Sequence, residues 1–325
     1  MLKLLSISDD AWCLNKFDHD TGKIESFLAD NGLHGLELMK WQNPQPNPIP
    51  PGKVIGRHLV FYPMWLDFWK SDREALLRHF GNEENCFQYY RAKSKDEWLE
   101  NYRRDLRDAS DMGVQYVVFH VTHITVEDTY SHSFPYSDGE VIESFIGLMN
   151  EILRGLNIRY TLLFENHWFP GLTFLNKHMT ERLLDGVDYP DKGLVLDIGH
   201  LMNTNMQLKS EQEAVPYILG VLDSLDTVKQ HIRAIHLNSS ITDESVREAL
   251  RNDTFDPRDS FDDRLIAAMR HVCKMDSHKP FEHPNIKKVI DAVQPQFLVY
   301  ELASDSFEEL LRVVQTQNKA IRQSF

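Results

Sequence analysis

The chain has 325 residues, of which 42% are hydrophobic and 11% aromatic, so it can bury one large core. Its formal net charge of −14 opposes a broad contact with nucleic acid, which normally depends on clustered lysine and arginine. The three cysteines, Cys13, Cys86 and Cys273, lie far apart, which argues against a disulfide framework or a thiolate zinc site. No signal peptide and no run of about 18 apolar residues is recognised, so we expect a cytoplasmic protein without a membrane partner.

Eight apolar runs, each with the length of a buried parallel strand, follow one another along the chain. They are residues 2–7, 33–39, 54–61, 114–121, 158–165, 193–197, 232–237 and 297–302. Most are separated by amphipathic stretches typical of helices, although the proline-rich connection 40–53 cannot hold a full helix. Eight such units predict an α/β fold, a single-domain (β/α)8 TIM barrel over residues 1–325. We also predict an insertion around residues 63–95, after the third strand.

Histidine and acidic side chains collect at or near the carboxyl ends of the last six predicted strands, where a barrel of this type carries its chemistry, and in one loop before the last strand, which holds Asp276 and His278. Any one of them alone is more often a hydrogen-bonded core residue than a ligand, so the prediction depends on the whole set. This much charge and imidazole at an apolar rim is unfavourable unless metal ions compensate it. The set is His58, His120, Glu165, Asp197, His200, His236, Asp276, His278 and Glu301.

The order of these short motifs resembles the AP endonuclease type 2, or xylose isomerase-like, family of TIM barrels, which includes endonuclease IV. The motifs read "GRH", "VVFH", "FENH", "LDIGH", "IHLN", "MDSH" and "VYEL". The resemblance implies up to three divalent metal ions. One would be held by His58, His120 and Glu165, a second by Glu165, Asp197, His236 and Glu301, and the third by His200, Asp276 and His278. Imidazole and carboxylate ligands suit Zn²⁺ first, with Mn²⁺ or Fe²⁺ as alternatives.

The same resemblance implies a metal-dependent hydrolase that attacks a phosphodiester or a sugar-phosphate, with Glu165 and Glu301 as the catalytic carboxylates. Two departures from the family pattern are Phe61 in place of a usual tyrosine, and Ser239 and Ser240 where an aspartate usually follows. Residues 63–107 carry balanced charge and offer no basic cradle for duplex DNA. We therefore expect a small or medium organic substrate that contains phosphate or sugar, and not a general DNA-repair enzyme.

Two other functions stay open at this point. A sugar or sugar-phosphate isomerase or epimerase would need one metal ion at Glu165, Asp197, His236 and Glu301, with the two glutamates as acid and base. That alternative leaves five of the nine residues without a role. A metal-free binding protein on the same scaffold is the third possibility, and metal content would discriminate among the three.

Overall fold

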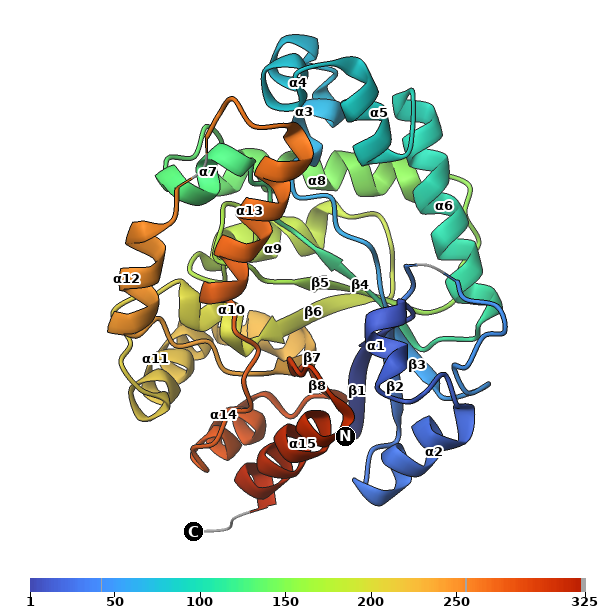
Figure 1. The fold of residues 1–325 in the computed structure, drawn as a ribbon, viewed down its shortest axis with the longest axis vertical. Helices are drawn as coiled ribbons and strands as arrows, with labels where there is room; N and C mark the ends of the chain where they lie inside the picture. The colour runs from blue at the N-terminus through green and yellow to red at the C-terminus, as the bar shows by residue number, and fades with distance from the viewer. Residues whose placement is uncertain (42, 255, 323–325) are drawn as a thin grey trace.

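The computed structural model describes residues 1–41, 43–254 and 256–322. Its eight strands run in sequence order around one closed barrel, and all neighbouring strands are parallel (Figure 1). The strands are β1 (Leu2–Ser8), β2 (Gly35–Met39), β3 (Val54–His58), β4 (Tyr116–His120), β5 (Thr161–Glu165), β6 (Lys192–Asp197), β7 (Ile232–Leu237) and β8 (Phe297–Tyr300). The predicted single-domain TIM barrel is therefore confirmed.

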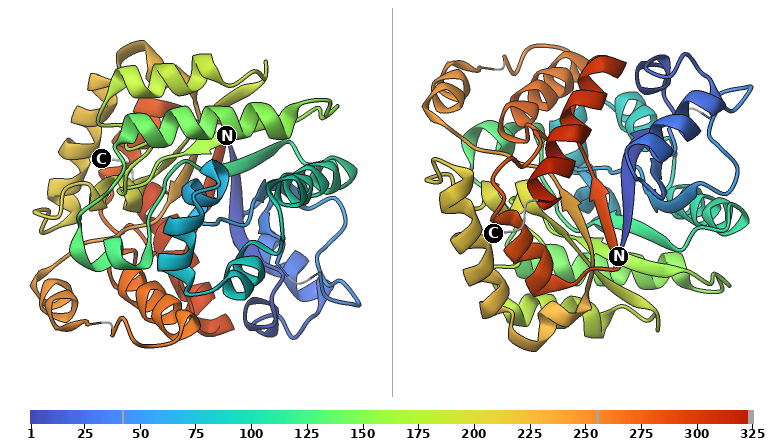
Figure 2. Two further views of the ribbon diagram at one scale, coloured as in Figure 1. Left: turned by 90° about the horizontal axis from the view of Figure 1, so that it is seen from above. Right: turned by 90° about the horizontal axis from the view of Figure 1, so that it is seen from below.

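Helices surround this barrel, as the two further views in Figure 2 show. Many begin at a side chain that accepts a hydrogen bond from the first turn; Ser94, for example, caps α6 through the backbone N–H of Glu97. The helices are α1 (Ala11–Asn15), α2 (Thr21–Asp30), α3 (Trp65–Lys70), α4 (Arg73–Phe80), α5 (Glu83–Tyr90), α6 (Lys95–Asp111), α7 (Val126–Ser131), α8 (Asp138–Leu153), α9 (Lys177–Gly186), α10 (Ile198–Asn203), α11 (Glu211–Ser224), η1 (Asp226–His231), α12 (Glu244–Asn252), α13 (Phe261–Met275), α14 (Ile286–Val293) and α15 (Phe307–Arg322). Within the described ranges, no helix is both long and apolar enough to cross a membrane.

The inside of the barrel is filled in layers. A compact apolar cluster that includes Val118, Leu163, Val195, Ala234 and Val299 fills the interior below the mouth. Because side chains alternate along a strand, the residue two positions after each of these also points inward, one layer closer to the carboxyl end. These next-layer residues are His120, Glu165, Asp197, His236 and Glu301. The period-two pattern therefore places the predicted site residues together above the apolar core.

The third strand ends earlier than predicted. The apolar run predicts a strand to residue 61, but β3 ends at His58. The carbonyl oxygen of Leu59 accepts a hydrogen bond from Nδ1 of His58 (2.9 Å). In the part of the chain that the structure describes, this carbonyl therefore bonds to a side chain and not to the backbone of a neighbouring strand. His58 is therefore the last residue of its strand, as are His120, Glu165 and Asp197 of theirs.

Helices that follow β3 and helices that follow β7 meet beside the barrel mouth. Helices α3, α4 and α5 occupy most of the 63–95 segment. The rings of Phe80 and Phe261 lie 4.6 Å apart between centroids, and the Arg264 guanidinium donates to the carbonyl oxygen of His79 (2.7 Å). Arg264 also pairs with Glu127 on α7 at 2.8 Å. These contacts fix α13, which leads directly into the loop of Asp276 and His278.

Candidate metal centre

Among the described residues, the nine predicted site residues lie in three groups at the carboxyl end of the barrel. Within each group, one potential ligand atom from every residue lies within 4.8 Å of the others. The groups are His58, His120 and Glu165; Glu165, Asp197, His236 and Glu301; and His200, Asp276 and His278. Glu165 belongs to the first two groups and therefore stands where two cations could be bridged.

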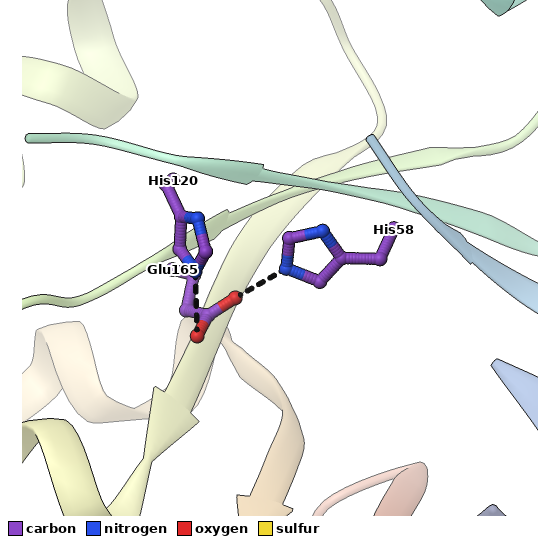
Figure 3. Close-up of side chains that lie close together, drawn as sticks. All are labelled: His58, His120 and Glu165. Carbon is purple, nitrogen blue, oxygen red and sulfur yellow. Dashed lines mark hydrogen bonds and ion pairs between the residues drawn. The ribbon is translucent and has the colours of Figure 1, made fainter. Parts of the chain in front are cut away.

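The first group places the Glu165 carboxylate between two imidazoles (Figure 3). Nε2 of His58 lies 3.0 Å from one carboxylate oxygen, and Nε2 of His120 lies 3.2 Å from the other. A carbonyl oxygen can only accept, so Nδ1 of His58 carries the hydrogen that it donates to Leu59. In a neutral His58 ring, Nε2 then turns its lone pair toward the carboxylate. Two acceptors at this distance need a proton or a cation between them.

The second group repeats this arrangement around His236. Its Nε2 lies 3.1 Å from one oxygen of Glu37, and its Nδ1 lies 2.9 Å from Glu301 and 3.4 Å from Glu165. The Glu37 carboxylate also accepts a hydrogen bond from the hydroxyl of Tyr116 at 2.6 Å. An outer carboxylate that receives the far N–H of a histidine is the usual support of a metal-binding imidazole, because it orients the ring and fixes its tautomer.

The spacing of Asp197 and His200 follows from the start of a helix. Asp197 is the N-cap of α10, and its Oδ1 accepts the backbone N–H of His200 at 2.6 Å. Nδ1 of His200 donates to the carbonyl oxygen of Asn166 (2.9 Å), while its Nε2 lies 3.3 Å from Asp276. The N-cap therefore fixes the positions of both residues and directs Nε2 of His200 toward Asp276, its partner in the third group.

The loop that holds Asp276 and His278 is hydrogen-bonded to the segment just after β7. Ser239 and Lys279 exchange two backbone hydrogen bonds of 2.7 and 3.1 Å, and the Ser240 hydroxyl donates to Asp276 at 3.2 Å. His278 has a φ of +45°, a left-handed conformation that is unfavourable for a residue other than glycine. Its Nε2 lies 2.8 Å from Asp276. The two serines that depart from the family pattern thus hold the third group in place.

The electrostatics of the centre indicate that positive charge is needed there. Burial alone would raise the pKa of Glu165, but the facing imidazoles of His120 and His236 hold that pKa well below its usual range. Burial raises the pKa of Asp197 to about 6, and neighbouring carboxylates add to this shift. Among the described residues, Nδ1 of His236 lies 2.9 Å from Oε2 of Glu301 and 3.4 Å from Oε1 of Glu165, yet none of these three buried atoms makes a hydrogen bond. Such atoms fit divalent cations, which accept imidazole and carboxylate ligands.

Sequence reasoning missed several residues of the centre. Glu37 is fully buried in β2 and contacts His236, and its signal is an acid inside an otherwise apolar strand. Asn166 and Asn238 stand inside recognised motifs; the Asn238 amide donates to Asp197 at 2.8 Å. His167 was not singled out either. Its ring stacks on Trp168 with 4.0 Å between centroids and lies 4.6 Å from the ring of His200.

Gly199 makes room for Asn238, so adding a methyl group there should disturb the centre. A Cβ at this position would lie 2.0 Å from Oδ1 of Asn238 and 2.8 Å from Oγ of Ser240. We expect Gly199→Ala to weaken metal affinity roughly 10- to 100-fold, the usual effect of losing an outer hydrogen bond to a ligand. Competition with a chelator would measure it.

Gly220→Ala is the matched control for this change. Gly220 lies within α11, and an added Cβ would meet no atom within 4 Å. Alanine should therefore leave metal affinity unchanged and raise helix stability slightly, by about 0.5–1 kcal/mol. Equal metal affinity in the two variants would show that the Gly199–Asn238 contact has no influence on the centre.

Comparisons with solved structures find other proteins similar in fold to this chain. Endonuclease IV from Thermus thermophilus is 17% identical, with 100% of each chain covered and a TM-score of 0.47. The IOLI protein, solved with a bound zinc atom, is 11% identical over 98% of this chain and 96% of its own, with a TM-score of 0.52. A sugar phosphate isomerase/epimerase from Parabacteroides distasonis ATCC 8503 is 11% identical over 100% and 97%, with a TM-score of 0.50.

At their identities the likenesses to the IOLI protein and to the Parabacteroides distasonis protein show the fold alone, and no curated protein matches the sequence. The family is shown by a separate finding, which covers most of the chain. The family model described as xylose isomerase-like TIM barrel matches residues 26–294. The chain therefore belongs to the xylose isomerase-like TIM-barrel family, whose model carries the AP endonuclease 2 name.

Proposed function

We propose that the protein is a metal-dependent hydrolase of a phosphodiester or sugar-phosphate, with up to three divalent cations at the barrel mouth. The observation that carries this proposal is the position of Glu165, which is fully buried. One of its oxygens faces His58, and the other faces His120, His200 and His236 at 3.2 to 3.4 Å. A carboxylate engaged on both oxygens suits a bridge between cations better than a freely accessible base.

The remaining site residues support more than one cation. His58 and His120 belong only to the first group, and the third group shares no residue with the other two. His58, His200 and His236 each direct one ring nitrogen to an outer oxygen, of Leu59, Asn166 and Glu37 respectively. This leaves one ring nitrogen of each histidine for a ligand role, as metal-binding histidines require.

The chemistry divides between the cations and the chain. When bound, the cations would make water acidic enough to attack at neutral pH and would neutralise phosphate oxygens. Glu165 would hold the first two cations at a fixed separation. Glu301, whose side chain is 18% exposed, is the most accessible carboxylate of the second group and would accept the proton that the attacking water loses.

A sugar or sugar-phosphate isomerase or epimerase remains the second candidate, because Glu165, Asp197, His236 and Glu301 together make a complete one-cation site. In that reaction the two glutamates would move a proton between neighbouring carbons. It would leave His58, His120 and the third group without a chemical role. For either enzyme we propose a small or medium organic substrate, because the net charge of −14 disfavours duplex DNA.

Metal content and turnover, measured on the same preparation, test the proposal. We expect up to three zinc, manganese or iron ions per chain by mass spectrometry, one for each group. Hydrolysis of bis(p-nitrophenyl) phosphate should disappear after chelation and return when Zn²⁺ or Mn²⁺ is added. A single ion per chain together with epimerisation of a ketose would instead establish the isomerase, and a metal-free, inactive chain would favour a binding protein.

A further inference from the structure

Two exposed tryptophans flank a hollow at the ends of β1 and β2, where the described residues include none of the three ligand groups. Trp12 is 57% exposed and Trp41 is 45% exposed, which is unusual for so large an apolar side chain. The hollow between the ends of β1 and β2 has a volume of about 380 Å³. Its lining consists of Ser8, Asp10, Ala11, Trp12, Met39 and Trp41.

The two rings are held in place by neighbouring groups. Asp10 caps α1, on which Trp12 lies, by accepting the backbone N–H of Cys13 at 2.9 Å. The buried Asp9 carboxylate accepts the backbone N–H groups of Trp41 and Asn43. Both rings therefore sit on backbone that is fixed by an aspartate.

Each ring also carries a cation on one side. The Lys16 ammonium lies 3.6 Å from the ring centroid of Trp12, and the Arg91 guanidinium lies 4.9 Å from that of Trp41. Cation–π contacts of this kind restrain a surface ring. Since each tryptophan stays about half exposed, ring surface remains available to a ligand. Arg91 comes from the 63–95 segment, where it follows α5.

The hollow adjoins the candidate metal centre. Met39 pairs with His58 in the barrel register and lies on the same side of β2 as Glu37, which contacts His236. On the side of the hollow that faces β8, the Lys16 ammonium donates a hydrogen bond to the hydroxyl of Ser304 (3.3 Å). Ser304 lies three residues after Glu301. A ligand in the hollow would therefore lie beside the strand ends that carry the first two groups.

We propose that Trp12 and Trp41 stack on the planar ring of a nucleotide-sized phosphoester whose phosphate points toward the metal centre. This inference rests on the proposed function and names its substrate class. A volume of about 380 Å³ lies near the lower end of ordinary small-molecule pockets, so one nucleoside fits and a duplex does not. Stacking of a base on an aromatic side chain strengthens binding roughly 5- to 150-fold per base. The cations over the two rings, Lys16 and Arg91, place positive charge near the hollow, whose own lining contains the acidic Asp10.

The test compares two ligands that share a phosphorylated ribose and differ by the base. Isothermal titration of the zinc-loaded protein should show adenosine 5′-monophosphate binding about tenfold or more tightly than ribose 5-phosphate. In the double variant Trp12→Ala and Trp41→Ala, the ratio of the two dissociation constants should fall to about one. The double phenylalanine variant should retain most of the ratio, because it keeps aromatic rings.

Leu175→Ala is the matched control, since Leu175 is also a large apolar residue and is 53% exposed. It should leave the ratio as in the wild type. A wild-type ratio near one, or a high ratio that persists in the double alanine variant, would overturn the stacking site. The ratio of dissociation constants measures binding alone and does not depend on turnover. It therefore tests the stacking site independently of the proposed hydrolase. A base-dependent ratio in a protein that hydrolyses no phosphoester would reject the hydrolase and keep the stacking site.

Discussion

Glu165→Gln is expected to lower hydrolytic turnover on the order of 10³-fold or more, while the barrel stays folded. This corresponds to a rise of several kcal/mol in the activation barrier. A neutral amide has nearly the same shape as the carboxylate, but it bridges cations poorly. Its NH₂ group would also face imidazole nitrogens that now surround the carboxylate at 3.0 to 3.4 Å. We expect at least one metal ion to be lost per chain, which mass spectrometry would count.

Glu248→Gln provides the matched control for this change. Glu248 lies on the exposed surface of α12, so the same loss of charge should alter neither metal content nor turnover. Circular dichroism would verify that both variants keep their helix content. Wild-type turnover in the Glu165 variant would exclude this residue as a bridge and, with it, the central feature of the proposed hydrolase.

The double change Asp276→Asn and His278→Ala is expected to remove one cation and to slow hydrolysis by about 10²-fold or more. These two residues supply two of the three side chains in the third group. An isomerase that uses only the group at β5 to β8 should lose much less activity. Metal analysis, combined with turnover of a phosphodiester and of several ketoses, would measure both effects.

A control pair with the same chemistry lies on α9, where His178 and Asp185 are exposed. Asp185→Asn with His178→Ala should leave metal content and turnover at wild-type values. If the Asp276 and His278 variant keeps its full metal content, or if a ketose is still epimerised at the original rate, the isomerase becomes the better description of the enzyme.

Much of the fold could be predicted because the apolar pattern repeats eight times with helical segments between. The layers of side chains inside the barrel also follow from the alternation of side chains along each strand. A strand such as "LVLD" places Val195 and Asp197 on one side, with the acid nearer to the mouth. Parallel strands bring such ends to one rim, which is why the six site residues at strand ends could be named from sequence and lie together in the structure. The other three, His200 on α10 and Asp276 and His278 in the loop after α13, were indicated by the motifs "LDIGH" and "MDSH" and not by strand periodicity.

The supporting contacts could not be predicted in the same way, because they join residues far apart in the chain. Nothing local in the β2 sequence shows that Glu37 meets His236, 199 positions later. The space that Gly199 leaves for Asn238 likewise depends on how α10 packs against the end of β7. The contact between Phe80 of α4 and Phe261 of α13 also joins residues far apart in the sequence. Each of these depends on tertiary packing and not on periodicity.

The contact between Glu37 and His236 joins strands that are not neighbours. In the barrel β2 lies between β1 and β3, whereas β7 lies between β6 and β8. Backbone hydrogen bonds connect each strand only to the next, but this side-chain contact spans the interior, and Glu165 extends it to β3 and β4 through His58 and His120. The mouth is therefore cross-linked as a single cooperative unit. Fraying of any one of these strand ends must break contacts on the opposite wall, so the rim should open as a whole.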